Sequence, residues 1–288
     1  MWAKYRGGVM MQLDPSGKIL RQYSDPYAHH DQNHLDDGTL LYTTLEPLTA
    51  DEAARVRGGI PGSEAPGGII YGDCIKLVDP WSVSNNSSSA DFDGSNGKGG
   101  AKLLCVSFDS EGNIIASTRN ASGVFIISRQ TGEVLWHLTA PVVCQQHCAH
   151  QINSAGDILI LDNGVFRPEI SVPFSRAIIV SRDKQIKWEY KDTTTGGLGF
   201  FTPFMGSAQK LENGNVLICE AATGRIMEVT EDGKVVWEFI VPQLQDYKAV
   251  MSKDELAEME RIGFSNQSNA IFRAYKYRPE EVPWVKED

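Results

Sequence analysis

A segment that recurs three times constrains the fold of this chain more than any other feature of its sequence. Each copy is an apolar run, a polar turn and a second apolar run that ends in tryptophan. The tryptophans are Trp136, Trp188 and Trp237, which lie 52 and 49 residues apart. A fourth copy, which lacks the tryptophan, opens the chain around the turn at Ser16 and Gly17.

A second kind of hairpin alternates with the first. It has a polar, glycine-containing turn followed by a strongly apolar strand, and turns of this kind favour two-residue hairpins. Two hairpins in about 50 residues make one four-stranded blade, which is the period of β-propellers. The turns of the second kind are at residues 37–38, 111–112, 155–156 and 213–214.

The sequence therefore predicts a single all-β domain over residues 1–288, a β-propeller of five or six four-stranded blades, five of which are visible in the repeat. A β-sandwich or jelly roll is the alternative, and the fixed phase of the tryptophans disfavours it. Residues 84–100 are rich in Ser, Asn and Gly and predict a flexible loop. A capping box at Ser252 predicts one helix over residues 252–263. Residues 269–275 follow as a last strand, which we expect to complete the first blade.

Composition excludes several classes of function. The formal net charge is -10 and the pI is about 5.1, so we expect no nucleic-acid partner. No apolar run approaches the roughly 20 residues that cross a membrane. The first residues do not resemble a secretory signal, and the five cysteines are scattered and odd in number. We therefore expect a cytoplasmic protein without a disulfide framework.

Two histidine clusters precede turns of the second kind: His29 with His30, and the segment from His147 to His150. Both occupy the start of an inner strand, where a propeller directs side chains into its central channel. Cys144, Cys148 and the two histidines of the second cluster are zinc-type ligands. Alternation along a strand separates them, so we predict no metal. The alternative for every histidine is a hydrogen-bonded structural role, which fits His34 best.

Arg119 ends the predicted strand over residues 114–118 in a third copy of the same hairpin. It is expected to face the same channel, and histidine with arginine in an enclosed pocket suits an anion such as a sulfate, carboxylate or phenolate. A salt bridge at the rim is the alternative for Arg119. Asp162, in the Asp-Asn-Gly turn, is a candidate to orient a neighbouring histidine.

Several of these motifs together resemble the aryl-sulfate sulfotransferase family. The resemblance covers nearly the whole chain and implies a six-bladed propeller in which an N-terminal stretch of family sequence is absent. It also implies transfer of a sulfuryl group between phenols through a sulfohistidine, with no cofactor. The segments that carry it are 57–62, 146–148, 161–164, 200–204, 206–220, 224–238 and 269–275.

By this resemblance His147 matches the nucleophile, and Arg119 and His30 match the groups that stabilise the sulfuryl oxygens and the departing phenolate. The ligand is then a small aromatic or phenolic molecule. The family places a His-x-Asn-Ser motif 17 or 18 residues before the arginine, whereas this chain has Lys102-Leu103-Leu104-Cys105 there. Lys102 would replace the missing histidine as a point charge. The predicted substrate contacts are His29, Lys102, His150, Phe201 and Gln209.

Three functional hypotheses follow. The first is sulfuryl transfer through His147. The second is a cofactor-independent biosynthetic cyclase or cycloaddition enzyme, which uses the same pocket to position its substrate and to donate hydrogen bonds to a carbonyl oxygen. The third is a propeller without catalytic activity that binds a partner on its face.

Overall fold

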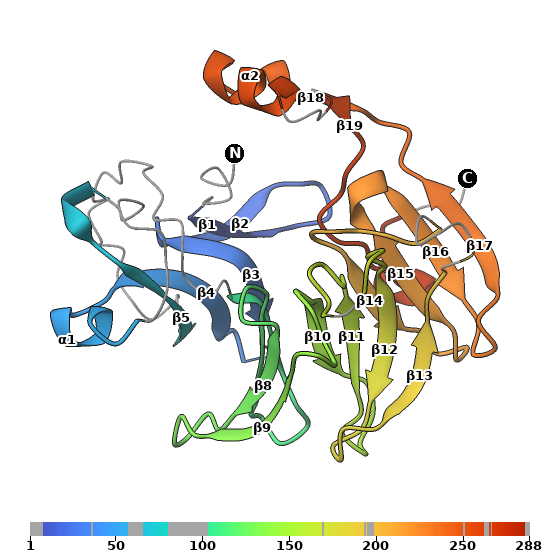
Figure 1. Cartoon of the computed structure of the whole chain (residues 1–288), viewed down its shortest axis with the longest axis horizontal. Helices are drawn as coiled ribbons and strands as arrows, with labels where there is room; N and C mark the ends of the chain where they lie inside the picture. The colour runs from blue at the N-terminus through green and yellow to red at the C-terminus, as the bar shows by residue number, and fades with distance from the viewer. Residues whose placement is uncertain are drawn as a thin grey trace.

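A computed structural model describes residues 8–35, 37–56, 66–79, 103–168, 170–192, 194, 199–249, 251–261, 265 and 267–285. The predicted loop over 84–100, Lys102 and the motif at 57–62 lie outside these ranges. The described chain is almost entirely β-structure in antiparallel sheets, as the sequence predicts (Figure 1).

Three sheets have four strands each and follow one another along the chain. The second sheet is β6 (Leu103–Phe108), β7 (Ile114–Thr118), β8 (Gly123–Ile127) and β9 (Val134–Thr139). The third sheet is β10 (His147–Gln151), β11 (Ile158–Asp162), β12 (Arg176–Val180) and β13 (Ile186–Tyr190). The fourth sheet is β14 (Ser207–Lys210), β15 (Val216–Glu220), β16 (Arg225–Val229) and β17 (Val235–Ile240).

The remaining elements lie toward the two ends of the chain. The first sheet has three described strands, β3 (Ala28–His34), β4 (Leu40–Pro47) and β5 (Tyr71–Val78). Two smaller pairs are β1 (Val9–Leu13) with β2 (Ile19–Ser24), and β18 (Gln245–Asp246) with β19 (Gln267–Ser268). The helices are α1 (Ala50–Ala53) and α2 (Lys253–Arg261). Neither helix has the length and apolar character that crossing a membrane requires.

The four main sheets form a fan in which the first strand of each sheet contacts the first strand of the next. β3 contacts β6, β6 contacts β10, and β10 contacts β14. The second strands are the most apolar and lie inside the core: every residue of β11 and of β15 is buried. Side chains from neighbouring sheets pack into shared clusters, so the sheets are held together by apolar contacts between their faces. This arrangement brings the starts of β3 and β10 toward the centre of the fan.

The tryptophan repeat has one structural explanation. In the second, third and fourth sheets the last two strands show a register shift at the same position, just before their final pair. The indole Nε1–H of Trp136 donates to the carbonyl of Arg182 over 2.8 Å, and that of Trp188 donates to the carbonyl of Glu231 over 2.9 Å. Each acceptor lies in the outer turn of the next sheet. The tryptophan period is therefore the period with which one sheet attaches to the following one.

Three predictions about local structure need correction. The turns of the second kind are longer than two residues: backbone pairs such as Asp109 with Asn113 close three-residue loops, with glycine in the left-handed region. A short helix, α1, was not predicted. Residues 269–275 do not form a strand and do not complete the first sheet, because they run beside β14 instead. Helix α2 is confirmed, with Ser252 and Glu255 forming the predicted capping box.

Candidate functional site

His147 begins β10 and is the most constrained histidine of the described chain. Its side chain is buried, and Nδ1 lies 2.6 Å from Asn163 Oδ1. The Asn163 Nδ2 donates to the carbonyls of Thr202 and Met205, at 2.7 and 3.0 Å, so its Oδ1 is the atom that faces the imidazole. Nδ1 of His147 therefore carries the proton, and Nε2 accepts from the Met205 backbone N–H over 3.2 Å.

The surroundings of His147 keep its imidazole neutral. Burial lowers its pKa from 6.5 to about 4; the Asn163 hydrogen bond opposes this shift, and the charges of Arg119 and Arg273 reinforce it. A neutral imidazole with the proton fixed on Nδ1 has its lone pair on Nε2. This is the protonation state that a nucleophilic histidine needs.

Arg119 follows β7 and reaches toward the same segment that holds His147. Its Nη2 donates to the carbonyl of Pro203 over 3.1 Å, and its Nη1 makes a 3.5 Å contact with Asn120 Oδ1. Its Nε is buried and has no hydrogen-bond partner. Burial alone lowers the pKa of Arg119, since no carboxylate among the described residues contacts it. The salt bridge at the rim, which was the alternative for Arg119, is therefore not seen among the described residues.

The segment between β13 and β14 organises these residues through its backbone. Thr202, Pro203 and Met205 supply the carbonyls and the N–H group that contact Asn163, Arg119 and His147. The buried Thr202 is itself held by Ser175, whose hydroxyl accepts from its N–H over 2.9 Å. The backbone of this segment therefore contacts the side chains of His147, Arg119 and Asn163.

Gln146, which precedes the histidine in the family motif, attaches β10 to the second sheet. It is fully buried, and its Nε2 donates to Ser117 Oγ and to the carbonyl of Gly123, at 3.0 and 2.7 Å. Its role is to position His147, and it lies away from the imidazole contacts.

The first-sheet cluster is a second group of polar side chains at the centre. His29 and His30 meet through their Nδ1 atoms at 2.8 Å, and His30 has a φ of 59°, an unusual conformation for a residue other than glycine. Nε2 of His29 lies 3.1 Å from Asp73 Oδ1, an ion-pair distance at which the geometry of a hydrogen bond is not met. The next residue, Asp31, is buried and binds Arg273 over 2.9 Å. His30 is thus linked to the centre of the fan, whereas His34 lies exposed at the end of β3.

Cys148 lies inside the second histidine cluster. It adopts a φ of 48° at the point where the β10 register shifts, and its thiol forms side-chain hydrogen bonds with the Cys105 thiol and the His150 imidazole. The hydrogen bond from Cys105 is the largest effect on the Cys148 pKa, which it lowers. The described residues contain no group of three or more His, Cys, Asp or Glu side chains that could hold a metal ion.

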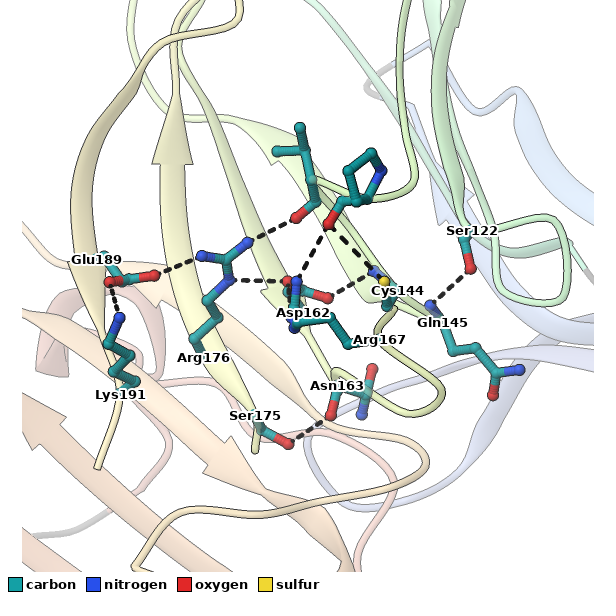
Figure 2. A network of polar contacts seen from close by, with 12 residues as sticks. Ser122, Cys144, Gln145, Asp162, Asn163, Arg167, Ser175, Arg176, Glu189 and Lys191 are labelled. Carbon is teal, nitrogen blue, oxygen red and sulfur yellow. Dashed lines mark hydrogen bonds and ion pairs between the residues drawn. The ribbon is translucent and has the colours of Figure 1, made fainter. Parts of the chain in front are cut away.

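Asp162 was predicted to orient a neighbouring histidine, but its contacts are structural. Asn163 is the residue that contacts His147. The fully buried Asp162 accepts from the Cys144 N–H over 2.8 Å and forms ion pairs with Arg167 and Arg176 at 2.6 and 2.9 Å (Figure 2). This network fixes the loop before β10 against β11 and β12. Figure 2 also shows Ser175 bonded to the backbone carbonyl of Asn163, which positions the amide for His147.

The other predicted contacts differ in their surroundings. Phe201 is half-buried, and its N–H donates to Glu220 Oε1 over 3.0 Å. Gln209 uses its whole amide on the backbone of Lys276, at 2.8 and 3.0 Å. His150 is half-buried beside Cys148. Sequence reasoning missed Asn163, Met205 and Arg273. Asn163 lies in the Asp-Asn-Gly turn that the sequence analysis named. Met205 acts through its backbone N–H, which the residue type does not indicate.

Comparison with solved structures returns distant neighbours. One is a protein of unknown function from Bacteroides caccae, with 22% identity over 49% of this chain and 46% of the other, and a TM-score of 0.38. Another is a virginiamycin B lyase from Staphylococcus aureus, with 15% identity over 75% and 56% of the two chains and a TM-score of 0.42. The β-propeller domain of Myceliophteria thermophila Cps50 (Swd1) has 10% identity over 83% and 69%, with a TM-score of 0.41. The chain spans about half the length of the first two structures.

No curated protein matches this chain. A family model does match it, over residues 4–241, which include every strand from β1 to β17 and the His147, Arg119 and Asn163 group. The match covers well over half of the sequence, so the chain belongs to the arylsulfotransferase (ASST) family.

Proposed function

We propose that this protein is an arylsulfotransferase-like enzyme that moves a sulfuryl group between aromatic or phenolic small molecules through His147, without a cofactor. The observation that carries the proposal is the pairing of a neutral, buried imidazole, with its proton fixed on Nδ1 by Asn163, with the charge of a guanidinium that no described carboxylate contacts. Nucleophile, orienting group and anion stabiliser are the three parts that such a transfer needs.

The first step uses the lone pair of His147 Nε2. It attacks the sulfur of an aryl sulfate, an N–S bond forms, and the S–O bond to the aryl group breaks with its electron pair on the departing phenolate. The phenolate takes a proton from solvent. In the second step the oxygen of an acceptor phenol attacks the sulfohistidine, loses its proton, and the N–S bond breaks to return neutral His147.

Two donors stand where charge would develop. Attack requires the hydrogen bond from the Met205 N–H to Nε2 to open, and this N–H then becomes a donor for a sulfuryl oxygen. Arg119 supplies the second donor, through its buried Nε, which has no hydrogen-bond partner among the described residues. His30 is proposed to stabilise the leaving phenolate, and His29, His150, Phe201 and Gln209 to line the aryl subsite with Lys102.

The proposal includes the number of blades. We take the fan of sheets as part of a six-bladed propeller, with the site at its centre. In this proposal the ligand lies beside the first strands, which contact one another in the order β3, β6, β10 and β14.

The decisive experiment incubates purified protein with 4-nitrophenyl sulfate and excess phenol and follows nitrophenol release and intact mass. We expect a sulfuryl adduct that is absent from His147→Ala, with a loss of turnover of at least about 10³-fold. Arg119→Lys should keep the adduct but lower its rate of formation by about 10²-fold. His137→Asn, at an exposed histidine on β9, is the matched control and should behave as the wild type. An unmodified wild-type protein that releases no nitrophenol would refute sulfuryl transfer.

One observation favours a second candidate, a cofactor-independent cyclase or cycloaddition enzyme. Both ring nitrogens of His147 are already hydrogen-bonded, as in a purely positioning histidine. In that case Arg119 would donate to a carbonyl oxygen of the substrate. Most of the rate enhancement would come from the way the pocket positions the reacting groups. This candidate predicts no sulfohistidine and only a partial loss of rate in His147→Ala, measured on the substrate of the cyclisation.

A further inference from the structure

A second arginine, Arg273, enters the centre of the fan from the C-terminal segment. This segment runs beside β14 in an extended form, held by backbone and side-chain hydrogen bonds. The Gly206 N–H donates to the carbonyl of Phe272 over 3.0 Å, and Ser207 Oγ exchanges hydrogen bonds with Ala274 at 3.1 and 3.2 Å. Gln209 does the same with Lys276. The position of Arg273 is therefore fixed on both sides along the chain.

The guanidinium of Arg273 is anchored through only one of its nitrogens. Nη1 donates to Asp31 Oδ1 over 2.9 Å and to the Tyr275 hydroxyl over 3.0 Å. Nε is buried and has no partner, and no described residue accepts a hydrogen bond from Nη2. The Nε and Nη2 protons lie on one edge of the planar group, which matches two oxygens of a carboxylate or sulfate.

Two aromatic rings lie beside the Arg273 guanidinium. The guanidinium lies over the rings of Phe272 and Tyr275, at 5.7 and 5.9 Å from their centroids, which holds its plane. The Phe272 ring is 6.5 Å from that of His30. The charge of Arg273 is also near enough to His147 to affect its protonation, as is that of Arg119. The Phe272 ring thus connects His30 to the same region as Arg273, and the charges of Arg119 and Arg273 both act on His147.

We infer that Arg273 is a second anion-binding residue of this site, whose Nε–Nη2 edge takes two oxygens of the anionic group of the ligand while Asp31 and Tyr275 hold Nη1. The inference rests on the proposed function for the identity of that ligand, an aryl sulfate.

The test is binding, measured by calorimetry with inorganic sulfate and with 4-nitrophenyl sulfate. We expect Arg273→Lys, which keeps the charge and loses the fork, to bind both about tenfold more weakly. Asp31→Asn removes a negative charge beside the anion and frees Nη1, so we expect binding several-fold tighter than in the wild type. Arg182→Lys is the control, because that arginine pairs with Asp109 and Gln151 at the outer turn between β12 and β13, and its affinity should be unchanged.

The outcomes separate this inference from the proposed function. Equal affinity in Arg273→Lys and the wild type, or a wild type that binds no sulfate, overturns the inference. If Arg273→Lys does not fold, Asp31→Asn decides: tighter binding supports it, and unchanged or weaker binding overturns it. Sulfate binding that depends on Arg273 without a sulfohistidine adduct supports the inference and contradicts only sulfuryl transfer. An adduct that forms with unchanged KM in Arg273→Lys contradicts only the inference.

Discussion

The third and fourth sheets are built from the same pattern and differ in what covers them. Their outer strands, β13 and β17, carry corresponding apolar residues on one face. In β13, Tyr190 is buried, packs against Phe200, and follows a half-buried Trp188. In β17 the corresponding Phe239 and Trp237 are 45% and 48% exposed. Since the two strands have nearly the same pattern, the burial of an outer strand is decided by the sheet that follows it.

An ion pair that occurs in both sheets is also more buried in the third sheet than in the fourth. Each sheet has an acid at the end of its second strand, paired with an arginine at the start of its third: Asp162 with Arg176, and Glu220 with Arg225. The arginine side chain is 11% exposed in the third sheet and 24% exposed in the fourth. One ion-pair motif thus lies in two environments, which allows the effect of a neighbouring sheet to be measured within one molecule.

The largest expected difference comes from removing the acid. Asp162→Asn leaves Arg167 and Arg176 without their buried carboxylate, so we expect a loss of about 3–4 kcal/mol in the free energy of unfolding. Glu220→Gln should cost about 1 kcal/mol, because Arg225 keeps its ion pair with Glu238 and is better solvated. Urea unfolding followed by tryptophan fluorescence compares the two. If both variants lose the same free energy of unfolding, coverage by a following sheet does not determine the strength of this ion pair.

The outer tryptophans give the next largest difference. Trp188→Ala removes an indole that packs against the core between the third and fourth sheets and donates to Glu231, and we expect a loss of about 2–3 kcal/mol. Trp237→Ala removes an indole of similar position on an uncovered strand, and should cost less than about 1 kcal/mol. Trp136→Ala, whose indole donates to Arg182, is the internal check and should resemble Trp188→Ala. The comparison fails if Trp237→Ala is as destabilising as the other two.

The sequence predicted the order of the sheets because the repeated tryptophans mark contacts between neighbouring sheets. The tryptophan period marks where each sheet attaches to the next, so it located the second, third and fourth sheets correctly. It failed for residues 269–275, which have an apolar, strand-like sequence. Their backbone is held by scattered contacts, such as those of Ala274 with the Ser207 side chain and of Phe272 with the Gly206 N–H, and such contacts leave no period in the sequence.

The sequence selected His147 and Arg119 because they occupy related positions in repeated hairpins. The structure links both to the segment around Pro203, and their catalytic roles stay predictions. The roles of Asp162 and Asn163 could not be distinguished by sequence, since successive residues leave a strand in different directions. Arg273 was missed because its neighbours at the site lie far away along the chain.

His147 connects the two sheets of this comparison, because Asn163 belongs to the third and Met205 leads into the fourth. Its folded pKa of about 4 lies below the ordinary value of 6.5, so between these values the unfolded chain binds a proton that the folded chain does not. The stabilisation is complete above pH 6.5 and is lost as pH falls toward 4. Between pH 7.5 and 5 we expect the free energy of unfolding to fall by about 2 kcal/mol from this group. In His147→Asn the fall over the same pH range should be smaller by this amount, whatever the stability of the variant. The same pH dependence of the free energy of unfolding in His147→Asn and the wild type would mean that the His147 imidazole is solvated. The contact between the third and fourth sheets would then be more open than the hydrogen bonds of His147 indicate.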